Sequence, residues 1–131
     1  MTIRKFALLP LLVLSACVTS GSQSKPLPHG DNVPLGQSAY VDGPVIRPIK
    51  VVEDSRCPAN ARCIWAGTVK IDALWARTGG DQTIELELGK PVSIADGTLE
   101  LTAVTPLRWA GKDREIQSKD YRFSFRFIGG L

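Results

Sequence analysis

Hydrophobic residues alternate with polar ones over most of the chain after residue 35, and this period of two is typical of β-strands with one buried face. The clearest run covers residues 68–76. The run at 83–88 follows it across a turn that contains two glycines, so the two runs predict a β-hairpin. A third run, at 121–128, is rich in aromatic residues at every second position. The residues expected to face the core are Val69, Ile71, Ala73 and Trp75, then Ile84, Leu86 and Leu88, and finally Tyr121, Phe123, Phe125 and Phe127.

Four weaker runs complete the set of predicted strands, and each is followed by Gly, Asp or Pro. They cover residues 35–41, 45–53, 92–95 and 98–105. In the second of these runs Val45, Ile49 and Val51 are expected to share the inner face. Pro48 predicts an edge strand or a β-bulge there, because proline cannot donate a ladder hydrogen bond.

The last two of these weaker runs are joined by Asp96 and Gly97, which predict a tight turn. In the run that follows, the inner residues are expected to be Leu99, Leu101 and Ala103. Residues 107–120 are charged and contain a single glycine, so they predict a long connection before the final strand.

Seven or so short strands in about 97 residues, with no window of helical periodicity beyond the first residues, predict an all-β domain. Their size and spacing favour a single antiparallel β-sandwich of the immunoglobulin-like size class, with a small β-barrel as the alternative. The pattern does not choose the strand order.

The beginning of the chain predicts export. Arg4 and Lys5 precede an apolar run of nine residues, which is too short to span a bilayer. Residues 14–17, L-S-A-C, then resemble the bacterial lipobox, in which the cysteine receives a diacylglycerol and becomes the new N-terminus. We therefore expect a lipoprotein signal peptide over residues 1–16 and lipidation of Cys17. An ordinary signal peptide that is cut nearby is the alternative.

Acyl chains on Cys17 would anchor the protein to a membrane, because each buried methylene contributes about 0.8 kcal/mol. Val18 stands where some Gram-negative lipoproteins have an aspartate for retention in the inner membrane, so an outer-membrane location is favoured. Residues 17–34 are rich in Ser, Gly and Pro, and predict a flexible tether on the order of 20 Å long. The domain is then expected to cover residues 35–131. His29, the only histidine, falls in the tether and is interpreted as a solvated residue.

The charge of the chain argues against a nucleic-acid partner. There are 16 Lys and Arg against 13 Asp and Glu, and removal of the leader with Arg4 and Lys5 leaves fourteen against thirteen. Binding to nucleic acid would call for a concentrated basic face. The expected partners are instead the membrane, through the lipid, and an envelope protein or polymer, through the domain.

Residues 54–67, DSRCPANARCIWAG, concentrate unusual residues in the middle of the chain. If Cys17 carries lipid, Cys57 and Cys63 remain as a pair in an oxidising compartment, which favours a disulfide. Their separation is wider than the C-x-x-C spacing of redox pairs. A ring this small contributes only about 2 kcal/mol, so its expected role is to fix the shape of a loop.

Arginines and tryptophans near this pair are the candidates for binding. Arg56 and Arg62 can bind a carboxylate or phosphate, because a guanidinium group presents a planar fork of donors. The alternative is that they are solvated or pair with the acidic residues just before them. Trp65 is expected to pack on the disulfide, as an indole does in many sandwiches, and Gly67 to allow a bulge or a positive φ. Trp109, in the charged connection, is the tryptophan best placed to contact a partner.

The sequence favours a protein without catalytic activity. A nucleophilic triad needs a histidine that the fold holds in place, and His29 lies in the predicted tether. The sequence contains no metal-ligand spacing of the usual kinds, so neither a metal nor another cofactor is expected. Cleavage of glycans by carboxylates stays open through two acidic pairs, Glu53 with Asp54 and Glu85 with Glu87.

The stretch at 54–67 resembles a D-S-R-C-P-x-x-x-x-C-x-W-x-G motif of small bacterial lipoproteins and exported proteins of uncharacterised function. The resemblance extends more weakly through the following strand and to a terminal strand entered by Asp120 and Tyr121. It implies the disulfide and a compact β domain, and it implies no activity or substrate.

Three hypotheses for function follow from these observations. The first is a non-enzymatic envelope interaction module that binds through the disulfide loop or the connection around Trp109. The second is an inhibitor that presents the loop between Cys57 and Cys63 to a secreted lysozyme or protease. The third is a glycan-active enzyme that uses its carboxylates.

Overall fold

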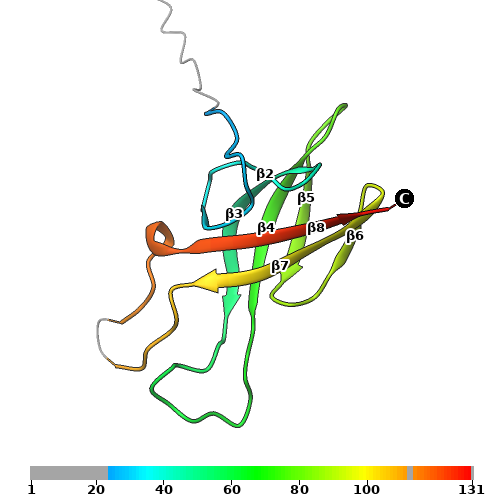
Figure 1. Cartoon of the computed structure of the whole chain (residues 1–131). Coiled ribbons are helices and arrows are strands. Elements are labelled where there is room, and N and C mark those ends of the chain that lie inside the picture. Colours follow the sequence, from blue (N-terminus) through cyan, green and yellow to red (C-terminus); the bar gives the residue numbers. More distant parts are fainter. Residues whose placement is uncertain (1–23, 112–113, 131) are drawn as a thin grey trace, which may run out of the picture.

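The computed structural model describes residues 24–111 and 114–130, and these form two antiparallel four-stranded sheets packed face to face (Figure 1). The first sheet, in spatial order, consists of β2 (Ala39–Tyr40), β3 (Val45–Asp54), β4 (Val69–Ala76) and β5 (Gln82–Glu87). The second consists of β1 (Val33–Pro34), β8 (Arg122–Gly129), β7 (Gly97–Thr105) and β6 (Val92–Ile94). A single 3-10 turn, η1 (Ser118–Asp120), precedes β8. The predicted all-β sandwich is confirmed, and the sheets do not close into a barrel.

The core lies between the two sheets, and the three strongly alternating runs supply most of it. All of the inner residues predicted for these runs are buried or half-buried. In the predicted hairpin Ile71 of β4 lies opposite Leu86 of β5, and in the second sheet Leu99 of β7 lies opposite Phe127 of β8. Phe123 is completely buried, which contributes about 1.5–3 kcal/mol relative to an exposed side chain.

The inner face predicted for β3 is wrong at its start, although the irregularity expected at Pro48 is confirmed. Ile46 and Pro48 are the buried residues, whereas Ile49 is 44% exposed. The register against β4 shifts between Pro48 and Lys50. Because a bulge adds one residue to a strand of period two, it exchanges the two faces. Only beyond it does Val51 turn inward, as predicted, to pack against the core.

A second bulge has the same effect in β7. The register against β8 shifts between Leu101 and Ala103, so Ala103, which was expected in the core, is exposed and Val104 takes the buried position. Nothing in the local sequence marks this bulge in the way that a proline marks the one in β3.

The tight turn before β7 lies one residue earlier than predicted. Ile94 pairs with Gly97, so the turn residues are Ala95 and Asp96. Gly97 serves another purpose, because a Cβ at this position would lie 2.0 Å from the carbonyl oxygen of Ile128. Glycine is required there for the close approach of β8, and not for the turn.

Within the run predicted as one strand at 35–41, only Ala39 and Tyr40 form a strand, β2, which pairs with β3. The other short strand, β1, lies before this run and pairs with β8 in the second sheet. Residues 24–34, which we assigned to the tether, lie against the sandwich. Val33 is completely buried, Leu27 bridges to Ala39, and the Gly30 carbonyl accepts a 2.8 Å hydrogen bond from the Phe125 amide. The Ser, Gly and Pro content of this segment conceals the few apolar residues that dock it.

The predicted signal peptide and Cys17 lie outside the described residues. Across the parts of the chain that the structure describes, no helix has the length and apolar character needed to cross a membrane.

The docked N-terminal segment and the loop at 55–67 lie at opposite ends of the sandwich (Figure 1). Leu27 packs beside β2, which pairs with the first residues of β3, whereas the loop leaves the other end of β3 after Asp54. β3 has 10 residues, so the two ends are about 30 Å apart along the strand.

The docking of the N-terminal segment predicts a stability effect. Val33→Ala should lower the free energy of unfolding by about 2 kcal/mol, because it removes two methyl groups from a completely buried site. Val52→Ala makes the same chemical change on an exposed position and should cost less than about 0.5 kcal/mol. Urea unfolding of both variants measures the difference. Equal effects would mean that residues before β2 do not belong to the folded domain.

Candidate functional site

The loop at residues 55–67, called here the disulfide loop, joins β3 to β4. The predicted disulfide is present, and it holds the Cα atoms of Cys57 and Cys63 5.8 Å apart. At the base of the loop the Cys57 amide donates to the Ala66 carbonyl at 2.9 Å. Gly67 has a φ of 70°, as predicted, and a Cβ at this position would lie 1.8 Å from the Ser55 carbonyl oxygen. The base of the loop is therefore closed by both covalent and backbone contacts.

A second segment, residues 106–111, braces one side of the disulfide loop (Figure 1). The Ala59 amide donates to the Arg108 carbonyl at 2.7 Å, and the Arg108 guanidinium donates to the Arg56 carbonyl at 2.7 Å. The Asn60 side chain pairs with both backbone groups of Ala110, at 2.8 and 3.1 Å. These bonds join segments about 50 residues apart in the sequence, and they limit the freedom of the loop.

A buried ion pair connects the loop to the core. The Nε and Nη2 atoms of Arg56 each donate to the Asp54 carboxylate at 2.9 Å, and the Arg56 Nη1 atom donates to the Val104 carbonyl at 2.9 Å. The Tyr121 hydroxyl donates to Asp54 at 2.8 Å. The side chains of Arg56 and Asp54 are only 12% and 9% exposed. Of the two roles considered for Arg56, pairing with an acidic neighbour is the one observed, so its guanidinium is occupied and not free for a ligand.

The network shifts the pKa of two groups. Burial alone would raise the pKa of Asp54, but the hydrogen bonds from Arg56 and Tyr121 and the positive charge of Arg56 outweigh it, so this pKa lies below its ordinary value of 3.8. Burial, together with the hydrogen bond to Asp54, raises the pKa of Tyr121 to about 12. The carboxylate is therefore charged and the phenol neutral at every physiological pH.

The disulfide loop exposes two large apolar side chains directly after Cys63. Ile64 is 93% exposed and Trp65 is 81% exposed, so the prediction that Trp65 packs on the disulfide is wrong. The physical reason is that this disulfide closes one loop beyond the strand ends. In the sandwiches that suggested the packing, the disulfide instead joins the two sheets through the core. Arg62 is also exposed.

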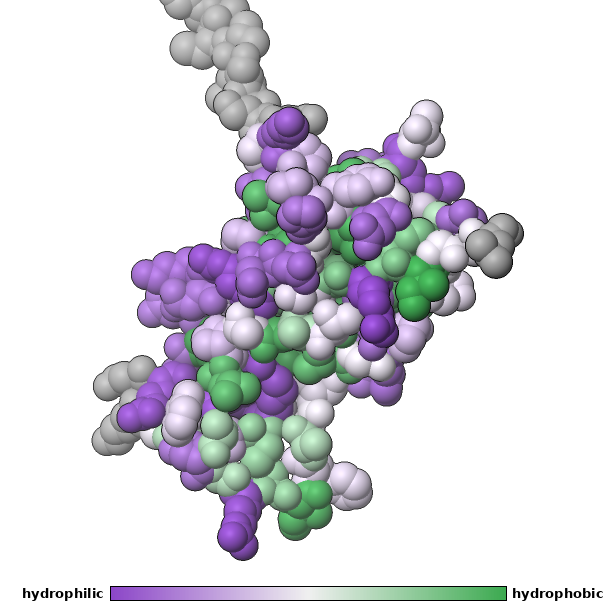
Figure 2. All heavy atoms as spheres, viewed as in Figure 1, coloured by the Kyte–Doolittle hydropathy of each residue, from purple (hydrophilic) through white to green (hydrophobic). Residues whose placement is uncertain are grey.

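The braced connection exposes apolar groups at the same end of the molecule. Trp109 is 48% exposed, as expected of a contact residue, and Leu107 beside it is exposed as well. The guanidinium of Arg114 lies 6.0 Å from the Trp109 ring. Hydrophobic and hydrophilic side chains lie side by side at this end (Figure 2). The sequence pattern does not reveal Ile64 and Leu107 as contact candidates, because their only signal is an apolar residue in a segment without periodicity.

The residues weighed for catalysis do not form one site. Glu53 pairs with Lys70 at 3.6 Å, which separates it from the buried Asp54. Glu87 pairs with Lys90 at 3.1 Å, and the hydrogen bond from Lys90 lowers the Glu87 pKa. His29 is exposed. Within residues 24–111 and 114–130, no three His, Cys, Asp or Glu side chains are grouped so that they could hold a metal ion.

Comparisons of the chain with protein-family models, with curated proteins and with solved structures found no match. Function is therefore argued from the site itself.

The buried ion pair predicts a pH-dependent stability. Asp54→Ala should cost about 3–5 kcal/mol at neutral pH, because the largely buried Arg56 guanidinium keeps its charge and its bond to the Val104 carbonyl but loses its carboxylate partner. The depressed pKa of Asp54 contributes stability above its unfolded value of 3.8, and this is lost as the pH falls through the lower folded value. The difference in the free energy of unfolding between wild type and variant should therefore narrow below about pH 4. Urea unfolding across a pH series measures this difference.

The control for this experiment is Asp72→Ala, which removes a carboxylate 4.0 Å from the exposed ammonium group of Lys50. It should cost less than about 1 kcal/mol at any of these pH values. A cost for Asp54→Ala as small as that of Asp72→Ala would contradict the structural role of the pair.

Tyr121 predicts an opposite effect in alkali. Its raised folded pKa means that it contributes stability in full below its unfolded value of 10.0, and this is lost as the pH rises towards about 12. In a titration followed by tyrosinate absorbance, the transition near pH 12 should vanish in Tyr121→Phe and persist in Tyr40→Phe. A transition that persists in both variants would show that Tyr121 does not donate to Asp54.

Proposed function

We propose that the protein is an exported, lipid-anchored envelope lipoprotein whose β-sandwich is a non-enzymatic binding module, and that it binds its partner through the disulfide loop. The single observation that carries this proposal is the exposure of Ile64 and Trp65 on a loop that is closed by the disulfide and braced by hydrogen bonds to residues 106–111.

The energetic argument concerns pre-organisation. A flexible loop would lose conformational entropy on binding, which reduces its affinity for a partner. The disulfide loop has already lost most of that freedom through the disulfide, the Arg56 ion pair and the Asn60 bonds to Ala110. Trp and Arg are also the side chains that most often dominate binding energy when a partner buries them. Trp65 and Arg62 therefore suit a contact surface.

The charge of the loop limits the kind of partner. Residues 55–67 contain two arginines and no Asp or Glu, and Arg108 and Arg114 lie in the bracing connection. Because Arg56 is neutralised by Asp54, the free positive charge is at Arg62. A fitting partner presents an apolar hollow with an acidic rim, since complementary charge guides association.

The position of the anchor supports a partner away from the anchoring membrane. Residues 24–30 pack at one end of the sandwich and the disulfide loop projects from the other. Cys17 precedes Ser24 by seven residues. This is shorter than the tether expected from the sequence, so an anchored domain would direct its loop outward from the lipid surface.

Inhibition of a secreted hydrolase is the second candidate, and the convex, clamped shape of the loop favours it. Hydrolases that act on glycans with a pair of carboxylates have acidic clefts. A projecting loop that exposes Arg62 and Trp65 and contains no acidic residue is complementary to such a cleft.

The test uses capture from envelope extract by the full chain, together with inhibition assays against purified lysozymes and proteases. The double variant Ile64→Ser with Trp65→Ala should lose the captured partner or the inhibition, and should unfold at the wild-type temperature because both side chains are exposed. Inhibition that the variant loses identifies the hydrolase class. Capture without inhibition supports the interaction module.

The matched control is Tyr40→Ala with Ile128→Ser, which removes two exposed apolar side chains away from the loop. This control should bind like the wild type. If the loop variant and the control both retain full capture and full inhibition, the disulfide loop is not the binding surface and the proposal fails.

A further inference from the structure

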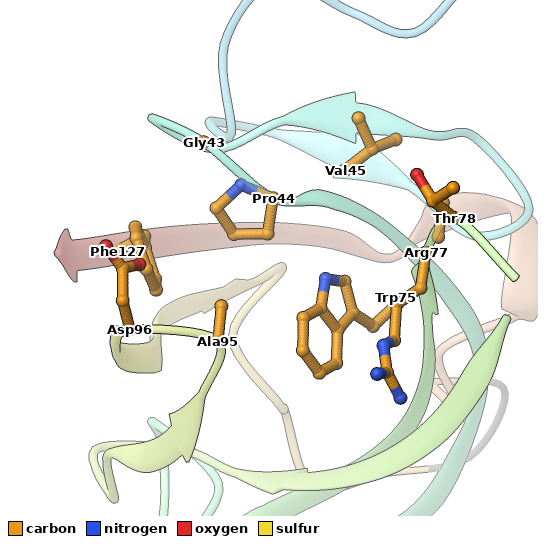
Figure 3. A pocket seen from close by; sticks show the side chains of 10 residues that line it. Gly43, Pro44, Val45, Trp75, Arg77, Thr78, Ala95, Asp96 and Phe127 are labelled. Atoms are coloured by element: carbon orange, nitrogen blue, oxygen red, sulfur yellow. The ribbon is translucent and has the colours of Figure 1, made fainter.

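A cleft of about 380 Å³ opens at the end of the sandwich opposite the disulfide loop (Figure 3). It lies between the two sheets, with Trp75 near the end of β4 on one side and the turn between β6 and β7 on the other. Figure 3 shows the Trp75 indole facing Ala95 and Phe127 across the cleft, with Pro44 above it. Its volume is within the range of small-ligand sites.

The polar atoms of the cleft are few and separate. The Arg77 guanidinium lies 4.8 Å from the Trp75 ring centroid and is held there by a 3.0 Å hydrogen bond from its Nη1 atom to the Gln82 side chain. Among the described residues, no side chain or backbone group accepts a hydrogen bond from the Trp75 indole nitrogen, and this nitrogen is not closed off from solvent. The Asp96 carboxylate is exposed on the facing side.

One lip of the cleft has an uncommon backbone conformation. Ala95 has a φ of 48° at the first turn position, where glycine is the usual residue. Such a conformation costs of order 1 kcal/mol, and residues of this kind gather at functional sites. In Figure 3 the small methyl group of Ala95 points into the cleft, so it leaves room between Trp75 and Phe127.

We propose that this cleft binds a sugar ring of an envelope glycan. The apolar C–H face of a pyranose can lie on the indole of Trp75, while its hydroxyls accept from the indole N–H and from Arg77 and donate to Asp96. The apolar face of Trp75 and the polar groups of the cleft would then both contact the ligand. This is a second site, and it does not depend on the disulfide loop.

Other ligand classes fit the same groups less well. A free anion would meet the Asp96 carboxylate, and a cation would meet Arg77 already placed over the Trp75 ring. A wholly apolar ligand would bury the indole N–H and the carboxylate without partners, and an unpaired buried polar group weakens binding. A neutral ring that carries hydroxyls can accept hydrogen bonds from the Trp75 indole N–H and from Arg77, and it can donate one to Asp96.

The three tryptophans of the chain make a direct test possible, because each gives one indole N–H signal in a nitrogen–proton correlation spectrum. The isotope-labelled full chain in detergent is titrated with chitotetraose, cellotetraose and maltotetraose. The Trp75 signal, assigned through Trp75→Phe, should move and saturate with at least one of these sugars. The signals of Trp65 and Trp109, at the other end of the sandwich, should stay in place.

Two variants and one competing ligand decide the outcome. Asp96→Ala changes an exposed turn residue and should weaken the sugar affinity about tenfold, whereas Asp120→Ala, at an exposed residue of η1 that does not line the cleft, should leave it unchanged. The proposal is overturned if the Trp75 signal is unmoved at millimolar concentrations of every sugar, or if Asp96→Ala binds as tightly as the wild type. It is also overturned if a proline-rich peptide moves this signal and no sugar does.

Discussion

The buried pair of Asp54 and Arg56 is the interaction on which the end of the molecule that carries the disulfide loop depends. It joins the end of β3, the disulfide loop, the Val104 carbonyl of β7 and the Tyr121 hydroxyl before β8. A buried ion pair stabilises a fold only when its remaining donors and acceptors are also satisfied. Here they are, and across the described residues no buried side-chain polar atom lacks a partner. With Arg56 fixed inside, the loop that follows has one orientation, and that orientation leaves Trp65 outside.

The edges of the sheets make the loops the natural place for binding. A free edge strand can pair with a strand of another protein, and proteins protect such edges with short strands or with charge. Three of the four edge strands, β1, β2 and β6, have only two or three residues. The fourth, β5, carries Glu85 and Glu87 on its outward face. All four edges are therefore protected against pairing with a strand of another protein.

The sequence predicts the fold well where neighbouring residues along the chain decide the structure. It fails where contacts between distant residues or shifts in strand register decide it. Alternation at residues 68–76 and 121–128 reports directly which side chains meet the core, and those assignments are confirmed. A bulge shifts the alternation by one residue, so Ile49 and Ala103 were placed on the wrong face. The role of Arg56 was open because the groups that bury it, Val104 and Tyr121, lie far away in the sequence.

The same distinction explains what the stretch at 54–67 means. Most of its distinctive residues have structural roles. Asp54 and Arg56 form an ion pair, the two cysteines form a disulfide, and Gly67 allows a close backbone approach. Ser55 also bonds with Thr68 through its hydroxyl and its amide. Trp65 stands apart from them, because it is exposed while the residues around it are held in place. A large indole kept in water by a rigid frame stabilises nothing within the domain. Under the proposed function, its contribution would come when a partner covers it, with the other residues of the stretch holding it in position for that contact.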